Sequence, residues 1–149
     1  MDDIKRILLV STPPRNFRKI VNYGISLSKK YGAKLYILHS FYDPFHERDW
    51  DSILAYKSSM REEYKKRQMK AKKDSDNILA SEKAQGLEVK EFMSKSGHSD
   101  EIIRIVEEEK IDLVLMLSHE RTRLEHHFFD LDKEKIILNM PCSILLVKA

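Results

Sequence analysis

The 149-residue chain has very little cysteine and no long apolar run. Cys142 is the only cysteine, so the chain cannot form an intramolecular disulfide, which suits the cytoplasm. No apolar run approaches the roughly 18 residues that a membrane-spanning helix needs. The opening MDDIKRILLV begins with acidic residues and lacks the basic region of a secretory signal. We therefore expect a cytoplasmic protein without a membrane partner.

A large excess of one charge is also missing, because 27 basic residues stand against 24 acidic ones and leave a net charge of +3. This balance does not favour nucleic acid as a partner. The stretch from Lys57 to Lys73 is locally basic and could contact nucleic acid or an acidic membrane. It carries no RNA-binding signature with interleaved aromatic residues, so a solvated helix surface is the preferred interpretation and we expect neither partner.

Five short apolar runs alternate with segments of helical length, and together they predict one domain over residues 1–149. The runs are Lys5–Val10, Ala33–His39, Leu87–Met93, Leu113–Leu117 and Ser143–Val147. Strands that are separated by helical crossovers favour a mainly parallel sheet with helices on both faces. The predicted fold class is therefore α/β and Rossmann-like, with five strands.

The segment between the second and third runs begins with aromatic residues and continues as a long helix, from about Ser52 to Ala84. Phe41–Tyr56 contains the only tryptophan, Trp50, and could either cover a cleft as a lid or pack its own aromatic side chains as a loop. A mostly apolar stripe along the helix should face the core. Its members are Tyr56, Met60, Tyr64, Arg67, Ala71, Ser75, Ile78 and Leu79.

The stretch from Ser118 to Leu131 follows the fourth apolar run, where open α/β sheets usually bind their ligands. Arginine and hydroxyl groups there could form an anion site, because both donate hydrogen bonds to negative oxygens. The candidates are Ser118, His119, Arg121, Thr122 and Arg123. The alternative is a solvated loop of alternating charge.

Other chemistry-bearing residues favour structural roles. His126 and His127 are adjacent, so on a helix they point about 100° apart, and no second His or Cys group accompanies them. With Asp130 and Asp132 they suggest a polar surface patch, and we expect no metal. Cys142 could be a reactive thiol, but no nearby base is visible in the sequence, so packing at the start of a strand is preferred.

No motif of a known catalytic site occurs in the chain. The sequence lacks a Gly-x-Ser-x-Gly nucleophile elbow, a phosphate-binding P-loop and a His-Glu-x-x-His metal motif. We therefore expect a protein that is not an enzyme, and we name no catalytic residue.

The order and spacing of these pieces resemble the universal stress protein family over nearly the whole chain. The matching pieces are KRILLV, YGAKLYILH, SKSGHSDEIIRIVEEEKIDLVLMLSH and NMPCSILLVK. The resemblance implies a five-stranded parallel α/β sheet and a role in stress response or signalling, with a protein partner that the sequence does not name. It also implies a homodimer that pairs its last strands, here Ser143, Ile144, Leu145, Leu146 and Val147.

Many members of that family bind ATP through a glycine motif after the fourth strand, and this chain departs from it. Glu120, Arg123 and Asp130 stand at the three glycine positions, and Leu131 replaces the following Ser or Thr. Thr12 stands where ATP-binding members carry an aspartate. A carboxylate near a triphosphate costs free energy through repulsion and desolvation. The resemblance thus implies a member without the motif and without a cofactor.

A divergent regulatory switch is the alternative. In this second hypothesis ATP, AMP or cyclic AMP binds through side chains rather than through a glycine-rich backbone. The side chains would be those of Thr12, Ser118, Arg121 and Arg123.

Overall fold

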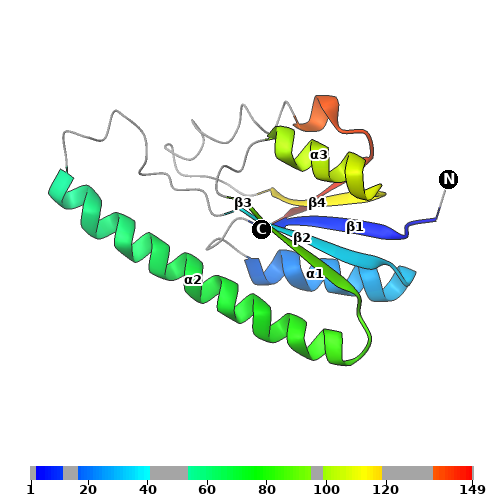
Figure 1. Ribbon diagram of the computed structural model, residues 1–149, viewed down its shortest axis with the longest axis horizontal. Helices are drawn as coiled ribbons and strands as arrows, with labels where there is room; N and C mark the ends of the chain where they lie inside the picture. The colour runs from blue at the N-terminus through cyan, green and yellow to red at the C-terminus, as the bar shows by residue number, and fades with distance from the viewer. Residues whose placement is uncertain (1–2, 12–16, 41–53, 95–98, 119–135, 149) are drawn as a thin grey trace.

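The computed structural model describes residues 3–11, 17–40, 54–94, 99–118 and 136–148. Within these ranges the chain forms one five-stranded sheet in which all pairings are parallel, in the order β3-β2-β1-β4-β5 (Figure 1). The strands are β1 (Arg6–Ser11), β2 (Lys34–Ser40), β3 (Val89–Ser94), β4 (Leu113–Ser118) and β5 (Ser143–Lys148). The α/β fold class with five strands is confirmed.

Each strand ends one residue later than the sequence predicted. The predicted strands stop at Val10, His39, Met93 and Leu117, one residue before Ser11, Ser40, Ser94 and Ser118. The backbone instead continues to pair, for example from Ser11 to His39 and from Ser40 to Ser94. Burial explains this extension for Ser11 and Ser40, since a buried backbone needs the hydrogen bonds of the sheet.

Helices cover both faces of the sheet (Figure 1). Helices α1 (Phe17–Tyr31) and α2 (Leu54–Ala84) lie on one side, and α3 (Ser99–Glu109) lies on the other together with a helical turn at residues 136–139. Gly32 and Gly86 follow α1 and α2 with φ of 63° and 103°, the left-handed geometry that ends many helices. None of the helices within the described ranges is long and apolar enough to cross a membrane.

Two apolar cores result from the alternation of side chains along the strands. Ile7 and Leu9 of β1 point toward α1 and α2, whereas Leu8 and Val10 point toward α3. The first core is completed by residues of the other strands and of α1 and α2, chiefly Ile20, Val21, Leu35, Ile37, Leu79 and Leu115. The second contains Tyr36, Leu38, Ile102, Ile105, Val106, Val114 and Met116. These cores fix the sheet on which any ligand site must be built.

The stripe along α2 is partly wrong as predicted. Ala71, Ser75 and Leu79 are buried as expected. Arg67, however, is exposed, and its neighbour Gln68, only 6% exposed, lies on the buried face instead. Neighbouring residues on a helix point about 100° apart, so the buried row runs through Gln68 and leaves Arg67 to solvent. The side chains of Tyr56 and Met60 lie outside the description.

Candidate functional site

Serine residues mark the carboxyl edge of the sheet, where open α/β folds bind ligands. Strands β1 to β4 end at Ser11, Ser40, Ser94 and Ser118, and the register sets Ser40 beside Ser94. The first three of these serines are buried. Among the described side chains, those of Ser11, Ser40 and Ser94 therefore place hydroxyl groups at the carboxyl ends of β1, β2 and β3.

The first turn of α3 adds negative charge to the same edge. The hydroxyl of Ser94 donates a hydrogen bond to a carboxylate oxygen of Glu101, and Asp100 precedes it in the first turn. Carboxylates are stabilised at a helix N-terminus because the helix dipole is positive there. An anionic ligand that approached the start of α3 would meet these two carboxylates, so this helix end disfavours phosphate.

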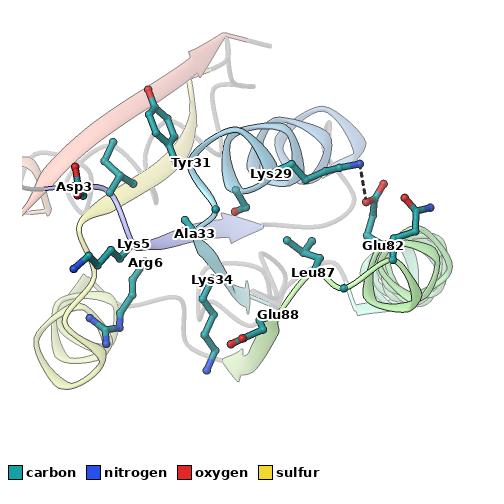
Figure 2. A pocket seen from close by; sticks show the side chains of 15 residues that line it. Asp3, Lys5, Arg6, Lys29, Tyr31, Ala33, Lys34, Glu82, Leu87 and Glu88 are labelled. Carbon is teal, nitrogen blue, oxygen red and sulfur yellow. Dashed lines mark ion pairs between the residues drawn. The ribbon is translucent and has the colours of Figure 1, made fainter.

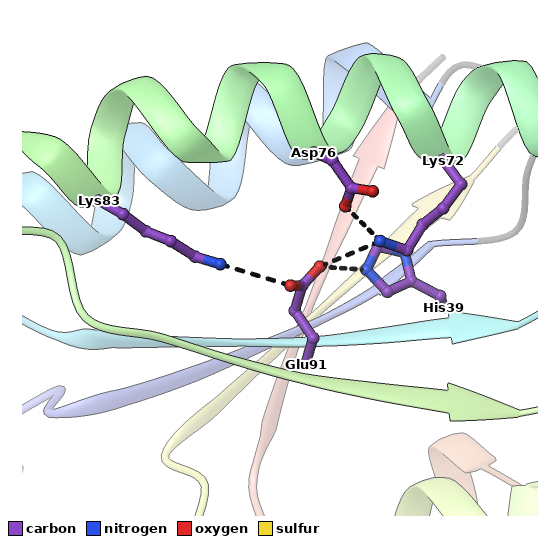
Figure 3. A network of polar contacts seen from close by, with 5 residues as sticks. All are labelled: His39, Lys72, Asp76, Lys83 and Glu91. Carbon is purple, nitrogen blue, oxygen red and sulfur yellow. Dashed lines mark hydrogen bonds and ion pairs between the residues drawn. The ribbon is translucent and has the colours of Figure 1, made fainter.

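A network of charged groups lies between helix α2 and strands β2 and β3, on the face of the sheet that α1 and α2 cover (Figure 3). The His39 ring, only 1% exposed, places Nε2 2.8 Å from Glu91 Oε1. Lys72 Nζ lies 3.6 Å from the same oxygen, and Lys83 Nζ lies 3.5 Å from Glu91 Oε2. Lys72 also pairs with Asp76 one turn along α2. We call these five residues the α2 clamp, since they join the helix to two strands.

Burial and charge shift the ionisation of two groups in the clamp. Burial lowers the pKa of His39, and this effect exceeds the opposing effect of the hydrogen bond that His39 makes with Glu91. Burial alone would raise the pKa of Glu91. The hydrogen bond with His39 and the charges of Lys72 and Lys83 together outweigh burial and lower that pKa. The favoured state is therefore a neutral His39 that donates its Nε2 hydrogen to an ionised Glu91.

An open hollow of about 1080 Å³ lies at the amino edge of the sheet (Figure 2). It is lined by the residues that precede β1, β2 and β3, and the Lys29–Glu82 ion pair joins α1 to α2 across it at 3.2 Å. The remaining charged groups around it are of both signs: Asp3, Lys5, Arg6, Lys34 and Glu88. Because the charge is mixed and the hollow lies away from the carboxyl edge, we assign no ligand to it.

The sequence profile of the universal stress protein family matches residues 3–148. The chain belongs to this family. No curated protein matches the chain.

Several solved structures share the fold. Hypothetical protein MJ0577 is 21% identical with a TM-score of 0.65, over 99% of this chain and 98% of its own. Universal stress protein UspA from Lactobacillus plantarum is 11% identical with a TM-score of 0.64, over 99% of each chain. A universal stress protein in complex with cAMP is 13% identical with a TM-score of 0.59, over 99% of this chain and 98% of its own.

The predicted nucleotide or anion site of this universal stress protein lies mostly outside the described ranges. Ser118 ends β4 at the carboxyl edge, as the prediction requires. Thr12, Arg121 and Arg123 lie outside, together with His119 and Thr122. The anion site therefore stays a prediction, with only the backbone of Ser118 placed.

The structure bears differently on the hypotheses of a metal site, an aromatic lid and a reactive cysteine. His126, His127, Asp130 and Asp132 lie outside the description, as do residues 41–53 of the aromatic segment. In the part of the chain that is described, no group of three His, Cys, Asp or Glu residues could hold a metal ion. Cys142 is half-buried, and burial, with a smaller effect of Asp112, raises the pKa of its thiol to about 11. Such a thiol stays protonated at neutral pH, in agreement with a packing role.

The α2 clamp was missed by sequence reasoning. His39 and Glu91 are 52 positions apart, and only the pairing of β2 with β3 brings them together. A usable signal was present, because an ionisable residue inside the apolar run KLYILH needs a polar partner if it is buried. The sequence does not indicate which carboxylate supplies it.

Proposed function

We propose that this universal stress protein is a non-enzymatic homodimer that acts in stress response or signalling through a protein partner. The observation that carries the proposal is the apolar surface of β5. Leu145 and Leu146 are 37% and 43% exposed, and β5 lies at an edge of the sheet with one side unpaired among the described strands. An exposed, apolar edge strand favours pairing with another chain.

A second copy of the chain is the simplest partner for this edge. Two β5 strands that meet about a two-fold axis would pair antiparallel, and each would cover the exposed leucines of the other. Leu145 and Leu146 point to opposite faces of the sheet, so a continuous sheet across the axis would bury apolar surface on both faces.

Within this proposal the protein does not bind ATP in the family's usual mode. The glycine motif places backbone N–H groups close to the phosphates. Here Glu120 and Asp130 stand at two of its three glycine positions, and no glycine follows Gly97 anywhere in the chain. Two carboxylates at a phosphate site oppose a triphosphate by repulsion and by desolvation.

The second candidate function is an adenine-nucleotide switch. Two observations favour it: the hydroxyl groups at the carboxyl edge, and the likeness of the fold to a universal stress protein solved with cAMP. Thr12, Ser118, Arg121 and Arg123 would bind ATP, AMP or cyclic AMP through side chains instead of a glycine-rich backbone.

The homodimer is tested by placing a charge on β5. Leu146→Lys should convert the dimer to a monomer, measured as mass in solution by light scattering, because pairing would bury two unpaired ammonium groups. Met93→Lys is the matched control, since Met93 is 60% exposed on β3, at the opposite edge. The control should stay dimeric. A dimer that survives Leu146→Lys would contradict the proposed interface.

Calorimetry and thermal shift with ATP, AMP and cyclic AMP decide between the two functions. A ligand at about 100 times its Kd should stabilise the fold by about 2.7 kcal/mol. The first proposal expects no shift with ATP at millimolar concentration. A shift that disappears in Arg121→Gln/Arg123→Gln, with the fold intact, would establish the switch instead.

A further inference from the structure

Helix α2 is joined to the sheet by both apolar and charged contacts. Among its described side chains, Leu79 joins the buried core, Ile78 packs against that core, and Ala71 is also buried. Lys72 and Lys83 add ion pairs with Glu91 of β3, and Lys72 also pairs with Asp76. Because these ion pairs contribute to the interface, the attachment of α2 depends on the ionisation of the groups in the clamp.

The charges of the clamp balance only while His39 is neutral. Lys72 and Lys83 contribute two positive charges, and Glu91 and Asp76 contribute two negative charges. Among the described residues, the charged groups with the main effects on the pKa of His39 are Glu91 on β3 and Lys72 with Asp76 on α2. A proton on His39 would add a third positive charge, in a site where the ring is almost fully buried.

The added charge would also compete for one acceptor. Glu91 Oε1 already serves both His39 Nε2, at 2.8 Å, and Lys72 Nζ, at 3.6 Å. An imidazolium there would sit beside the Lys72 ammonium, and burial of an excess charge is costly unless the group reaches water. The buried charge can reach water if α2 moves away from the sheet, because Lys83 and Asp76 on α2 are already half-exposed. The strands cannot move in this way, because their backbone pairing holds them.

We propose that the α2 clamp is an acid-sensitive latch: protonation of His39 releases helix α2 from the β2–β3 side of the sheet while the sheet itself stays folded. Above the titration of His39 the helix is docked. Below it the charged interface opens, and the face of α2 that contains Ala71, Ser75 and Leu79 becomes accessible. A protein of this family would thereby change its surface when its surroundings acidify.

Amide hydrogen exchange on the full-length protein tests the latch. Protection factors, corrected for the intrinsic effect of pH, are compared at pH 7.5 and pH 5.0 for α2 amides at residues 71–79 and for β1 amides at residues 8–10. Local release predicts that protection in α2 falls about tenfold or more and that α2 amides are far less protected than β1 amides at pH 5.0, because α2 opens while the sheet stays folded. Equal protection of the two elements at pH 5.0 would overturn the proposal, because α2 would then open only by global unfolding.

Two variants connect the effect to His39. His39→Gln keeps an N–H that can donate to Glu91 but cannot gain a proton, so α2 should retain its protection at pH 5.0. Glu88→Gln alters an exposed carboxyl group just before β3 and should behave like the wild type. A full pH-dependent loss in His39→Gln would overturn the proposal.

A measurement on the wild type covers the case in which His39→Gln does not fold. Nitrogen-15 chemical shifts of the His39 ring and of the α2 amides are followed over the same pH range. The latch predicts that both change with one common midpoint. Midpoints that differ by more than about half a pH unit would overturn it, since the ring and the helix would then respond to different protons.

Discussion

Asp112 and Arg6 exchange two hydrogen bonds at the amino edge of the sheet. The carboxylate of Asp112 accepts from the backbone N–H of Arg6 at 2.9 Å, and the backbone N–H of Asp112 donates to the carbonyl of Arg6, also at 2.9 Å. The same carboxylate oxygen accepts from the N–H of Lys5 at 2.8 Å. One side chain thus satisfies two backbone donors where β1 begins and holds β1 against the chain that enters β4.

Removal of this carboxylate should weaken the fold. Asp112→Ala leaves the N–H groups of Lys5 and Arg6 without their acceptor, and we expect a loss of about 1–3 kcal/mol in the free energy of unfolding. Asp112→Asn keeps one acceptor oxygen and should cost less. Urea unfolding measures both, with Glu107→Ala on the exposed side of α3 as the control. An Asp112→Ala variant as stable as that control would show that water replaces the carboxylate without cost.

Gly24 marks the closest approach of α1 to the sheet. A Cβ atom at this position would lie 2.5 Å from Cδ2 of Leu9 and 3.2 Å from Cδ1 of Leu35. Alanine has the higher helix propensity by about 1 kcal/mol, but overpacking of a core costs about 1–3 kcal/mol. We therefore expect Gly24→Ala to lower stability by about 1 kcal/mol, measured as the midpoint of urea unfolding.

A second substitution separates packing from propensity at Gly24. Leu9→Val removes the methyl group that a new Cβ would meet, so the double variant Gly24→Ala/Leu9→Val should be more stable than the sum of the two single effects. Ser26→Ala on the exposed side of α1 reports propensity alone and should be neutral or slightly stabilising. Strict additivity in the double variant would contradict the packing explanation.

The fold could be predicted because local patterns and the global architecture agree. In the predicted run Ala33–His39, the apolar residues Leu35–Leu38 are buried on both faces, and such runs alternate with helical segments, as in the units that build parallel sheets. The errors are local. Ser40 lies beyond the predicted end of the strand but continues it, and Arg67 is assigned to the buried face where Gln68 lies. Both errors arise because tertiary burial overrides the preference of a single residue.

The candidate sites were less accessible from sequence. The His39–Glu91 contact depends on the register of β2 against β3, in which Ile37 lies beside Glu91, and register follows from packing rather than from either segment alone. The proposed nucleotide site rests on Thr12, Arg121 and Arg123, which lie outside the described residues. Pairing through β5 likewise stays a prediction, supported by the exposed leucines.

The α2 clamp also predicts how global stability depends on pH. The pKa of His39 is below its ordinary value of 6.5 in the folded chain, so unfolded chains bind the proton first as pH falls. Stability from neutral His39 is therefore complete above about pH 6.5 and is lost as pH falls from there through the lower folded pKa. Glu91, whose pKa is also lowered, adds a second loss below its ordinary value of 4.5.

Urea unfolding midpoints at pH 7.5, 6.0, 5.0 and 4.0 measure both losses. The wild type should lose stability in two stages, the first below pH 6.5 and the second below pH 4.5. His39→Gln should weaken the first stage and keep the second, whereas Glu91→Gln should weaken the second. The chain contains five other histidines, so the difference between wild type and His39→Gln is the decisive quantity. A His39→Gln profile that runs parallel to the wild type between pH 7.5 and 5.0 would mean that His39 titrates alike in folded and unfolded chains.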